Sequence, residues 1–214
     1  MENAEGGSMD LIMKGFDWLA TLAFLNILWL GFTLAGGILF GAGPATFAVN
    51  ALVKKKLHQD DLSHVFTKFK TEFKEHFKEG NRYFWLVTAA SLFIYVDIRV
   101  IQALPQNTFI QLVVLPSLLI LSALVIIVAT FALGIYFEFG DSVIKSLKDA
   151  FWLTLISPVA GIMIVHAFLI GLLVYAYVPA LIMFYSVSSY AFVTQWIMSK
   201  TFKRIKRKKY SNSY

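Results

Sequence analysis

The sequence contains no cysteine and few charged residues, and both shortages limit what the protein can be. Without cysteine, the chain forms neither disulfides nor thiolate metal sites. Only 15% of its 214 residues are charged and 58% are hydrophobic, whereas about a quarter of the residues in an ordinary soluble domain are charged. The composition therefore indicates a membrane protein.

Recognisable catalytic motifs are also missing from the sequence. It has no Walker A motif, so we do not expect the chain to hydrolyse ATP itself. It has no convincing Ser/His/Asp order, and no convincing metal-ligand spacing around His58, His64 or His76. We therefore predict that the protein is not an enzyme and has no catalytic residues, cofactor or metal site.

Five apolar runs are long enough to cross a bilayer, whose hydrocarbon core is about 30 Å thick. The last two runs need a tight hairpin near Pro179, because a single helix of their joint length would measure roughly 70 Å. The predicted fold is therefore all-α, a single polytopic membrane domain over residues 1–214. The five predicted transmembrane helices cover residues 17–41, 83–104, 109–136, 151–177 and 179–198.

The segments between these runs are basic and amphipathic. We predict cytoplasmic amphipathic helices at 44–57, 61–80 and 141–150, followed by a basic cytoplasmic tail at 199–214. The second of them has an apolar face with four phenylalanines at helical spacing, Phe66, Phe69, Phe73 and Phe77. This face either lies on anionic lipid at the inner leaflet or forms a docking surface for a partner. We do not expect nucleic-acid binding, because acidic residues alternate with the basic ones.

The distribution of basic residues predicts an orientation. Of 19 Lys and Arg residues, eight lie between the first two runs, two between the third and fourth, and seven in the tail. Lys14 alone lies on the opposite side, and Arg99 lies within a run. The positive-inside rule then places the N-terminus outside and the C-terminus in the cytoplasm. Because the acidic N-terminal segment lacks the features of a cleavable signal, we expect it to be retained.

Four polar residues fall inside the apolar runs at a similar predicted depth. Ionisable side chains in a bilayer are costly and need partners. We predict that the four form one polar layer, which either holds the helices together or lines a path for a substrate, ion or proton. Helix packing is the preferred interpretation. The four residues are Asn26, Asp97, Arg99 and His166.

Small residues in and after the first run predict a close approach of another helix. They occur in pairs at the four-residue spacing that allows two helix backbones to meet, and a Gly-Pro pair follows them. We expect the partner to be another helix of this chain or another protein. The positions are Gly31 and Ala35, Gly37 and Gly41, and Gly43 and Pro44.

Two motifs resemble a known family. Asn26-Ile27-Leu28-Trp29, a glycine-rich continuation and Gly43-Pro44-Ala45-Thr46 are similar to the opening signature of the YesL-like bacterial membrane proteins. The Phe/Lys-rich helix before the second run and the chain length also match that family.

The resemblance implies a multi-pass protein of the bacterial plasma membrane. Genes of the family commonly lie beside carbohydrate ABC importers, so the resemblance also implies sugar permease subunits as partners. We therefore expect a non-enzymatic accessory subunit of an oligosaccharide importer. The alternative is a stand-alone small-molecule transporter or channel that uses the polar layer.

Overall fold

The computed structural model describes the backbone of residues 2–60, 62–105 and 107–211, and the side chains of 12–60, 62–105 and 107–207. All regular structure in these residues is helical, which confirms the all-α prediction. The helices are α1 (Glu2–Ala35), α2 (Ala42–Leu57), α3 (Val65–Glu75), α4 (Phe77–Ala103), the short π-helix η1 (Ile110–Val114), α5 (Leu115–Phe139), α6 (Val143–Ile156), α7 (Pro158–Tyr177) and α8 (Ala180–Ser211).

Five of the described helical segments are long and apolar enough to cross a membrane, in agreement with the predicted number. The fourth starts later than predicted, because Pro158 begins α7 and the preceding residues complete α6. Proline suits the first turn of a helix, where its missing N–H leaves no bond unmade. The segments are Ile12–Ala35, Phe77–Ala103, Ile110–Phe139, Pro158–Tyr177 and Ala180–Arg207.

The predicted helix at 61–80 is two helices, because His76 separates α3 from α4. The predicted helix at 141–150 corresponds to α6, which starts after Ser142. The hydroxyl of Ser142 accepts a hydrogen bond from the N–H of Lys145 and so caps this helix. The tail at 199–214 continues α8 to Ser211, while residues 61 and 212–214 lie outside the described residues.

Helix α2 forms the centre of the molecule, which corrects the prediction of a surface helix at 44–57. Eleven residues between Ala42 and Val53 are buried. The helix packs against α1, α3, α4, α5 and α8. The run up to Val53 has no charge, and its many small side chains let neighbours approach from all sides. The lysines that suggested an amphipathic helix occupy only its last turn.

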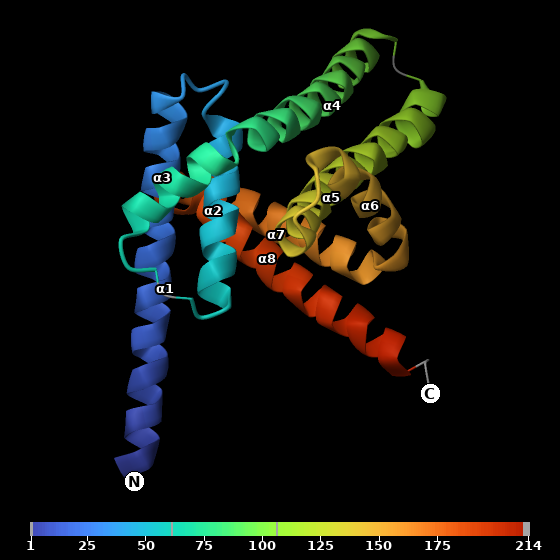
Figure 1. The fold of residues 1–214 in the computed structure, drawn as a ribbon. Helices are drawn as coiled ribbons and strands as arrows, with labels where there is room; N and C mark the ends of the chain where they lie inside the picture. The colour runs from blue at the N-terminus through green and yellow to red at the C-terminus, as the bar shows by residue number, and fades with distance from the viewer. Residues whose placement is uncertain (1, 61, 106, 212–214) are drawn as a thin grey trace.

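Helix α2 runs back alongside α1 (Figure 1) after a turn that depends on glycine. Gly37 has a φ of +73°, a conformation that L side chains rarely adopt. A Cβ on Gly41 would lie 2.9 Å from the carbonyl oxygen of Phe32, so a side chain has no room there.

The far end of this α1–α2 hairpin brings together two residues that the predicted topology separates. Lys56 Nζ forms an ion pair with the Asp17 carboxylate at 2.7 Å, and it lies 5.1 Å from the centre of a Trp18 ring. An out-to-in span at 17–41 would put Asp17 and Lys56 on opposite sides of a bilayer. The structure contradicts that separation, since the start of the hairpin and its end lie side by side.

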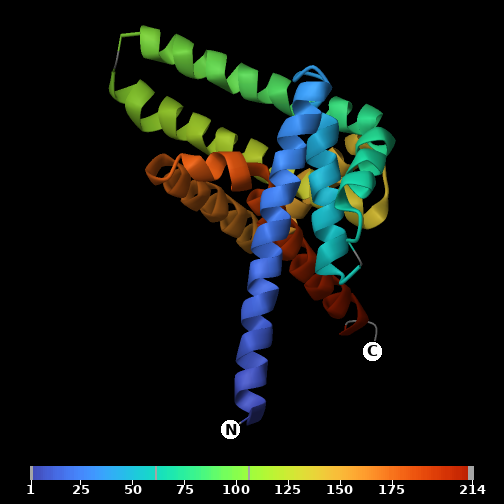
Figure 2. The same ribbon diagram turned by 90° about the vertical axis from the view of Figure 1, so that its left-hand side faces the viewer.

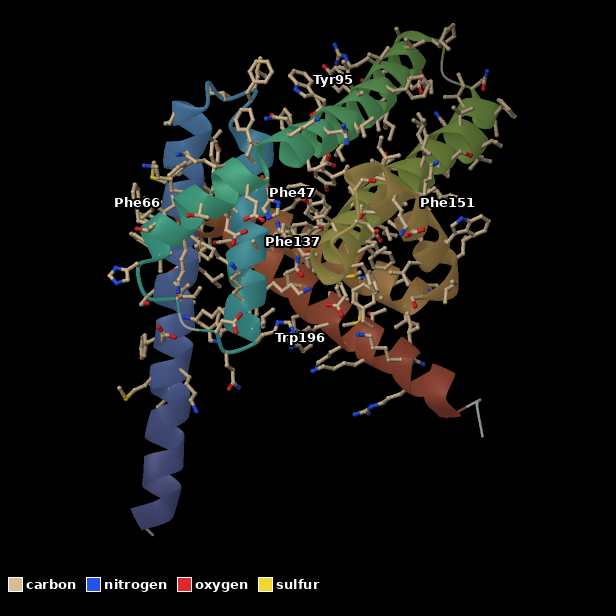
Figure 3. The ribbon with its side chains drawn as sticks, viewed as in Figure 1. Phe47, Phe66, Tyr95, Phe137, Phe151 and Trp196 are labelled. Carbon is tan, nitrogen blue, oxygen red and sulfur yellow. The ribbon has the colours of Figure 1, made fainter. Side chains whose placement is uncertain are left out.

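The other helices join this centre through aromatic packing and through α8. Phe47 of α2 packs against Tyr83 of α4 and against Tyr136 and Phe137 of α5, with ring centres 5.5, 5.0 and 5.5 Å away. Figure 3 shows Phe47 and Phe137 in this central position. The α4–α5 hairpin projects away from the rest of the molecule, and α1 crosses its direction steeply (Figure 2).

Candidate functional site

Asn26 of α1 is inserted into the backbone of α8, and its side chain is completely buried. Its Nδ2 donates hydrogen bonds to the carbonyls of Met183 at 2.9 Å and Ile182 at 3.3 Å. Its Oδ1 accepts hydrogen bonds from the N–H groups of Val187 at 2.9 Å and Ser188 at 3.2 Å. A side-chain amide has two donor hydrogens and two acceptor lone pairs, so the joint leaves Asn26 no capacity to bind a substrate.

The insertion of Asn26 into α8 accounts for a bend in this helix. In an uninterrupted helix the N–H of Val187 would pair with the carbonyl of Met183, yet here both groups bond to Asn26. A side chain that enters the hydrogen-bond ladder in this way kinks a helix. Figure 2 shows α8 bending beside α1. The path of the last apolar helix therefore depends on one amide in the first.

A second buried amide pair, which the sequence analysis missed, joins α2 to α8. Gln195 Nε2 donates to Asn50 Oδ1 at 3.1 Å, and both residues are buried. Asn50 Nδ2 donates to the carbonyl of Thr46 at 2.9 Å within α2. The available signal was an amide inside the apolar run Ala48–Val53, which resembles the signal that identified Asn26.

The Gly43-Pro44-Ala45-Thr46 motif connects α2 to both α1 and α4. Trp29 Nε1 donates to Thr46 Oγ1 at 3.0 Å and ties α1 to α2. A Cβ on Gly80 of α4 would lie 2.8 Å from Cα of Pro44. A Cβ on Gly43 would lie within 3.0 Å of the carbonyl oxygen of Gly80. The motif therefore lets the backbones of α2 and α4 touch.

The other small residues of the predicted packing set have different positions. Gly37 and Gly41 belong to the turn between α1 and α2. Gly31 and Ala35 are exposed on α1, and a Cβ on Gly31 would meet nothing within 4 Å. Within the described part of the chain, no helix packs on Gly31.

The four residues of the predicted polar layer are not brought together. Asn26 bonds to α8, whereas His166 is exposed on α7 and its Nδ1 lies 2.8 Å from the carbonyl of Ile162 in its own helix. Asp97 and Arg99 lie on α4, which packs mainly on α2 and α5. Equal distances along two helices mean equal depth only if the helices are parallel, and α1 crosses α4 steeply (Figure 2). The prediction of one layer is corrected on this ground.

The phenylalanine face of α3 is largely covered by the chain itself. Phe32 of α1 packs against Phe66, Phe69 and Phe73, with ring centres 5.8, 5.0 and 5.1 Å away. Phe69 is completely buried, while Phe66 and Phe77 are 55% and 43% exposed. The face therefore holds α3 on the α1–α2 hairpin, and only its edges remain for lipid or a partner.

Charged residues from four helices meet beside the end of α2. Lys54 Nζ pairs with Glu138 of α5 at 3.0 Å, and Lys206 of α8 pairs with the same carboxylate at 3.2 Å. Lys55 pairs with Glu72 of α3. Lys54, Lys55, Glu72 and Glu138 line an open pocket of about 490 Å³ in which acidic and basic side chains face each other. Most of its charges are therefore satisfied within the chain.

Glu72 is the most enclosed carboxylate of this pocket. Its carboxylate lies 3.2 Å from His76 Nε2, while His76 Nδ1 lies 3.1 Å from the hydroxyl of Tyr136. The hydrogen bond from His76 and the interaction with Lys55 hold the pKa of Glu72 below its usual value, although burial acts in the opposite direction. Glu72 thus stays charged and fixes α3 to α2. Among the described residues no group of three or more His, Asp or Glu is placed to hold a metal ion.

Part of the sequence matches a family of known proteins. A family described as "Protein of unknown function, DUF624" matches residues 22–98. Uncharacterized protein YesL of Bacillus subtilis (strain 168) is 31% identical over 48% of this chain and 49% of its own. The resemblance to the YesL-like family is confirmed. Two further uncharacterized proteins of the same strain are similar: YteU is 33% identical over 44% of this chain and 43% of its own, and YesV is 26% identical over 91% and 93%.

The matched part of the chain contains several of the contacts described above. The alignments cover about half the length of YesL and YteU but nearly all of YesV. No solved structure matches the chain. The segment 22–98 includes Asn26, Trp29 and the Gly43–Thr46 motif, and it ends within α4. The matched segment therefore contains the contacts of Trp29 with Thr46 and of Gly43 with Gly80, which join α1, α2 and α4, and it contains Asn26, which joins α1 to α8.

Proposed function

We propose that this YesL-like chain is a non-enzymatic accessory subunit, in the bacterial plasma membrane, that binds the permease subunits of an oligosaccharide ABC importer. The partner class comes from the family resemblance, because genes of such proteins commonly lie beside carbohydrate importers. One structural observation supports an accessory role. The chain uses its buried amides for its own packing, and among the described residues two ionisable side chains have no partner on an uncovered hairpin.

That hairpin is formed by α4 and α5. Its exposed apolar side chains include Leu92, Phe93 and Val100 of α4 and Leu119 and Ile120 of α5, each more than half exposed. Lipid alone covers such side chains without cost. Exposed apolar side chains alone therefore do not indicate a protein partner for the hairpin.

Asp97 and Arg99 supply the feature that indicates a protein partner. Both lie within the apolar segment Phe77–Ala103, and the described part of the chain gives neither of them a hydrogen bond or ion pair. Charged groups at membrane depth are costly unless they are paired, so a polar group on a permease helix favours binding here. A stand-alone transport path through Asn26, Asp97 and His166 is not proposed, since these residues lie apart.

Removing both charges should release the permease. We expect Asp97→Leu/Arg99→Leu to lower recovery of the permease with the tagged chain about tenfold, which corresponds to a loss of ~1.4 kcal/mol of binding free energy. Recovery is measured by quantitative mass spectrometry after solubilisation in a mild detergent that keeps the permease intact. His166→Leu is the matched control and should leave recovery unchanged, because His166 is exposed and bonds only to its own helix. Recovery of the wild-type chain without any permease would contradict the proposal.

We also propose that both termini face the cytoplasm, in place of an external N-terminus. The pairing of Lys56 with Asp17 supports this orientation, because it sets the start of α1 level with the end of α2. Lys54 and Lys55 at that same end pair with α5 and α3. The four apolar segments from α4 onward then return the chain to the side on which it entered. The basic ends of α2 and α8, which both pair with Glu138 of α5, share one side in this arrangement, as the positive-inside rule requires.

The absence of cysteine makes this orientation testable with single-cysteine variants. In intact cells, a membrane-impermeant maleimide should label Thr108→Cys in the α4–α5 connection. Gly15→Cys should react only after permeabilisation, as should Lys203→Cys on α8. Gly15 is exposed, and an added Cβ there meets nothing within 4 Å. Labelling of Gly15→Cys in intact cells would instead establish an out-to-in first span.

A further inference from the structure

A pocket of about 340 Å³ lies between the start of α7 and the second half of α8. Its walls are mostly apolar. Ile156 and Val159 form one side, Trp196 and Ile197 form the other, and Met163 continues the first side along α7. Ile156 and Val159 are 70% and 60% exposed, so one wall of the pocket is open along the surface of the molecule.

Two basic residues, Lys200 and Arg204, line the same pocket from successive turns of α8. Lys200 Nζ lies 3.6 Å from the centre of a Trp196 ring, and no acidic residue lines the pocket. Within the described residues, neither Lys200 nor Arg204 forms an ion pair. The contrast is with six basic residues that each pair with a carboxylate: Lys54, Lys55, Lys56, Arg82, Lys145 and Lys206.

The start of α7 adds no clear positive potential to this pocket. Helix α6 ends at Ile156, directly before α7, so the negative end of one helix lies beside the positive end of the next. Pro158 has no N–H, and the N–H groups of Ala160 and Gly161 already bond to the carbonyl of Ser157. The positive potential of the pocket therefore comes from Lys200 and Arg204, and no acidic side chain in its lining offsets them.

The position of the pocket along the chain identifies the kind of anion. Helix α8 changes after Trp196 from an apolar sequence to one that contains Lys200, Lys203 and Arg204. Such a transition, with a tryptophan beside it, is typical of the level of lipid headgroups. A soluble phosphate would need only the charges. The exposed apolar wall beside them suits the glycerol and first methylenes of a phospholipid, and basic pockets between membrane helices bind anionic headgroups.

We infer that this pocket binds one anionic phospholipid, whose phosphate lies between Lys200 and Arg204 and whose acyl chain follows Ile156 and Val159. The assignment is independent of the importer proposal and needs only that α7 and α8 lie in a membrane. It gives anionic lipid a defined site that is separate from the phenylalanine face of α3.

The site can be tested by titrating the purified full chain in detergent with phosphatidylglycerol and phosphatidylcholine of identical acyl chains. Native mass spectrometry should show one phosphatidylglycerol bound at least about tenfold more tightly than phosphatidylcholine. Lys200→Gln/Arg204→Gln should abolish this preference. The control Lys203→Gln/Arg207→Gln removes the same charge from the same helix outside the pocket and should retain it. Equal losses in both double variants would show diffuse electrostatic attraction and overturn the assignment.

Two further measurements test the lipid site if the Lys200→Gln/Arg204→Gln variant folds poorly. Val159→Trp fills the apolar wall without changing a charge, and it should weaken phosphatidylglycerol binding about tenfold. Inorganic phosphate that is added at constant ionic strength should not displace the lipid. Displacement by phosphate, or unchanged lipid binding in Val159→Trp, would mean a site for a soluble anion and would overturn the phospholipid. The melting temperature of each lipid-free variant separates loss of binding from loss of fold.

Discussion

Replacing Gly43 by leucine should strongly destabilise the fold of this chain. A Cβ at position 43 would lie 2.9 Å from Cβ of Phe84 and within 3.0 Å of the carbonyl oxygen of Gly80. The obstructing oxygen belongs to a backbone, so no flexible side chain can move to make room. The collision would force α4 away from α2, the most buried helix of the fold.

The expected loss is at least about 3 kcal/mol, the upper end for overpacked sites, or a fall of roughly 6–12 °C in melting temperature for a chain of this size. Thermal melting followed by intrinsic fluorescence in detergent measures it. Gly31→Leu is the matched control, since a side chain at this exposed helical position meets nothing within 4 Å. Gly80→Leu should behave like Gly43→Leu, because it enters the same contact from α4. A normal melting curve for Gly43→Leu would show that the two backbones do not touch.

The fold class follows from the sequence because it depends on the length of apolar runs, and four of the five predicted spans overlap the observed segments without change of role. The role of the first run is different. Hydropathy measures how apolar a segment is, but it does not show whether the next segment returns alongside it. Residues 42–53 are too short to predict as a span, so the hairpin with α1 is visible only through contacts such as Lys56 with Asp17.

The candidate site shows the same limit at the level of single residues. The sequence identifies Asn26 as unusual, because an amide in an apolar run needs a hydrogen-bond partner. It does not identify the partner, which is the backbone of α8 and carries no side-chain signature. Likewise, the spacing of Phe69 and Phe73 indicates an apolar face on α3. The residue that packs on this face is Phe32 of α1, and nothing in the sequence distinguishes it from the other apolar residues of that helix.

Replacing Asn26 by leucine should destabilise the chain by removing the joint between α1 and α8. Leucine has a similar volume, so the cavity term is small, and the cost comes from the four backbone groups that Asn26 satisfies. Helix–helix hydrogen bonds in membranes average about 0.6 kcal/mol each, and an unsatisfied buried group costs about 1–3 kcal/mol. We therefore expect the free energy of unfolding to fall by about 2–4 kcal/mol. Thermal melting in detergent measures it, as for Gly43→Leu.

A polar-to-apolar change at Thr154 is the control for this prediction. The Thr154 hydroxyl donates to the Ala150 carbonyl of its own helix at 2.9 Å, so Thr154→Val leaves the contacts between helices unchanged. Its effect should stay within about 0.5 kcal/mol. If Asn26→Leu were equally mild, the amide would not hold α8.

A straighter α8 is the expected structural consequence of Asn26→Leu. Without the inserted amide, the N–H of Val187 can pair again with the carbonyl of Met183, which recovers part of the lost free energy but removes the cause of the bend. Spin labels on Gly15→Cys and Lys203→Cys would report this change as an altered distance between α1 and the end of α8. An unchanged distance together with reduced stability would mean that the bend is fixed by packing elsewhere and that Asn26 only holds the two helices together.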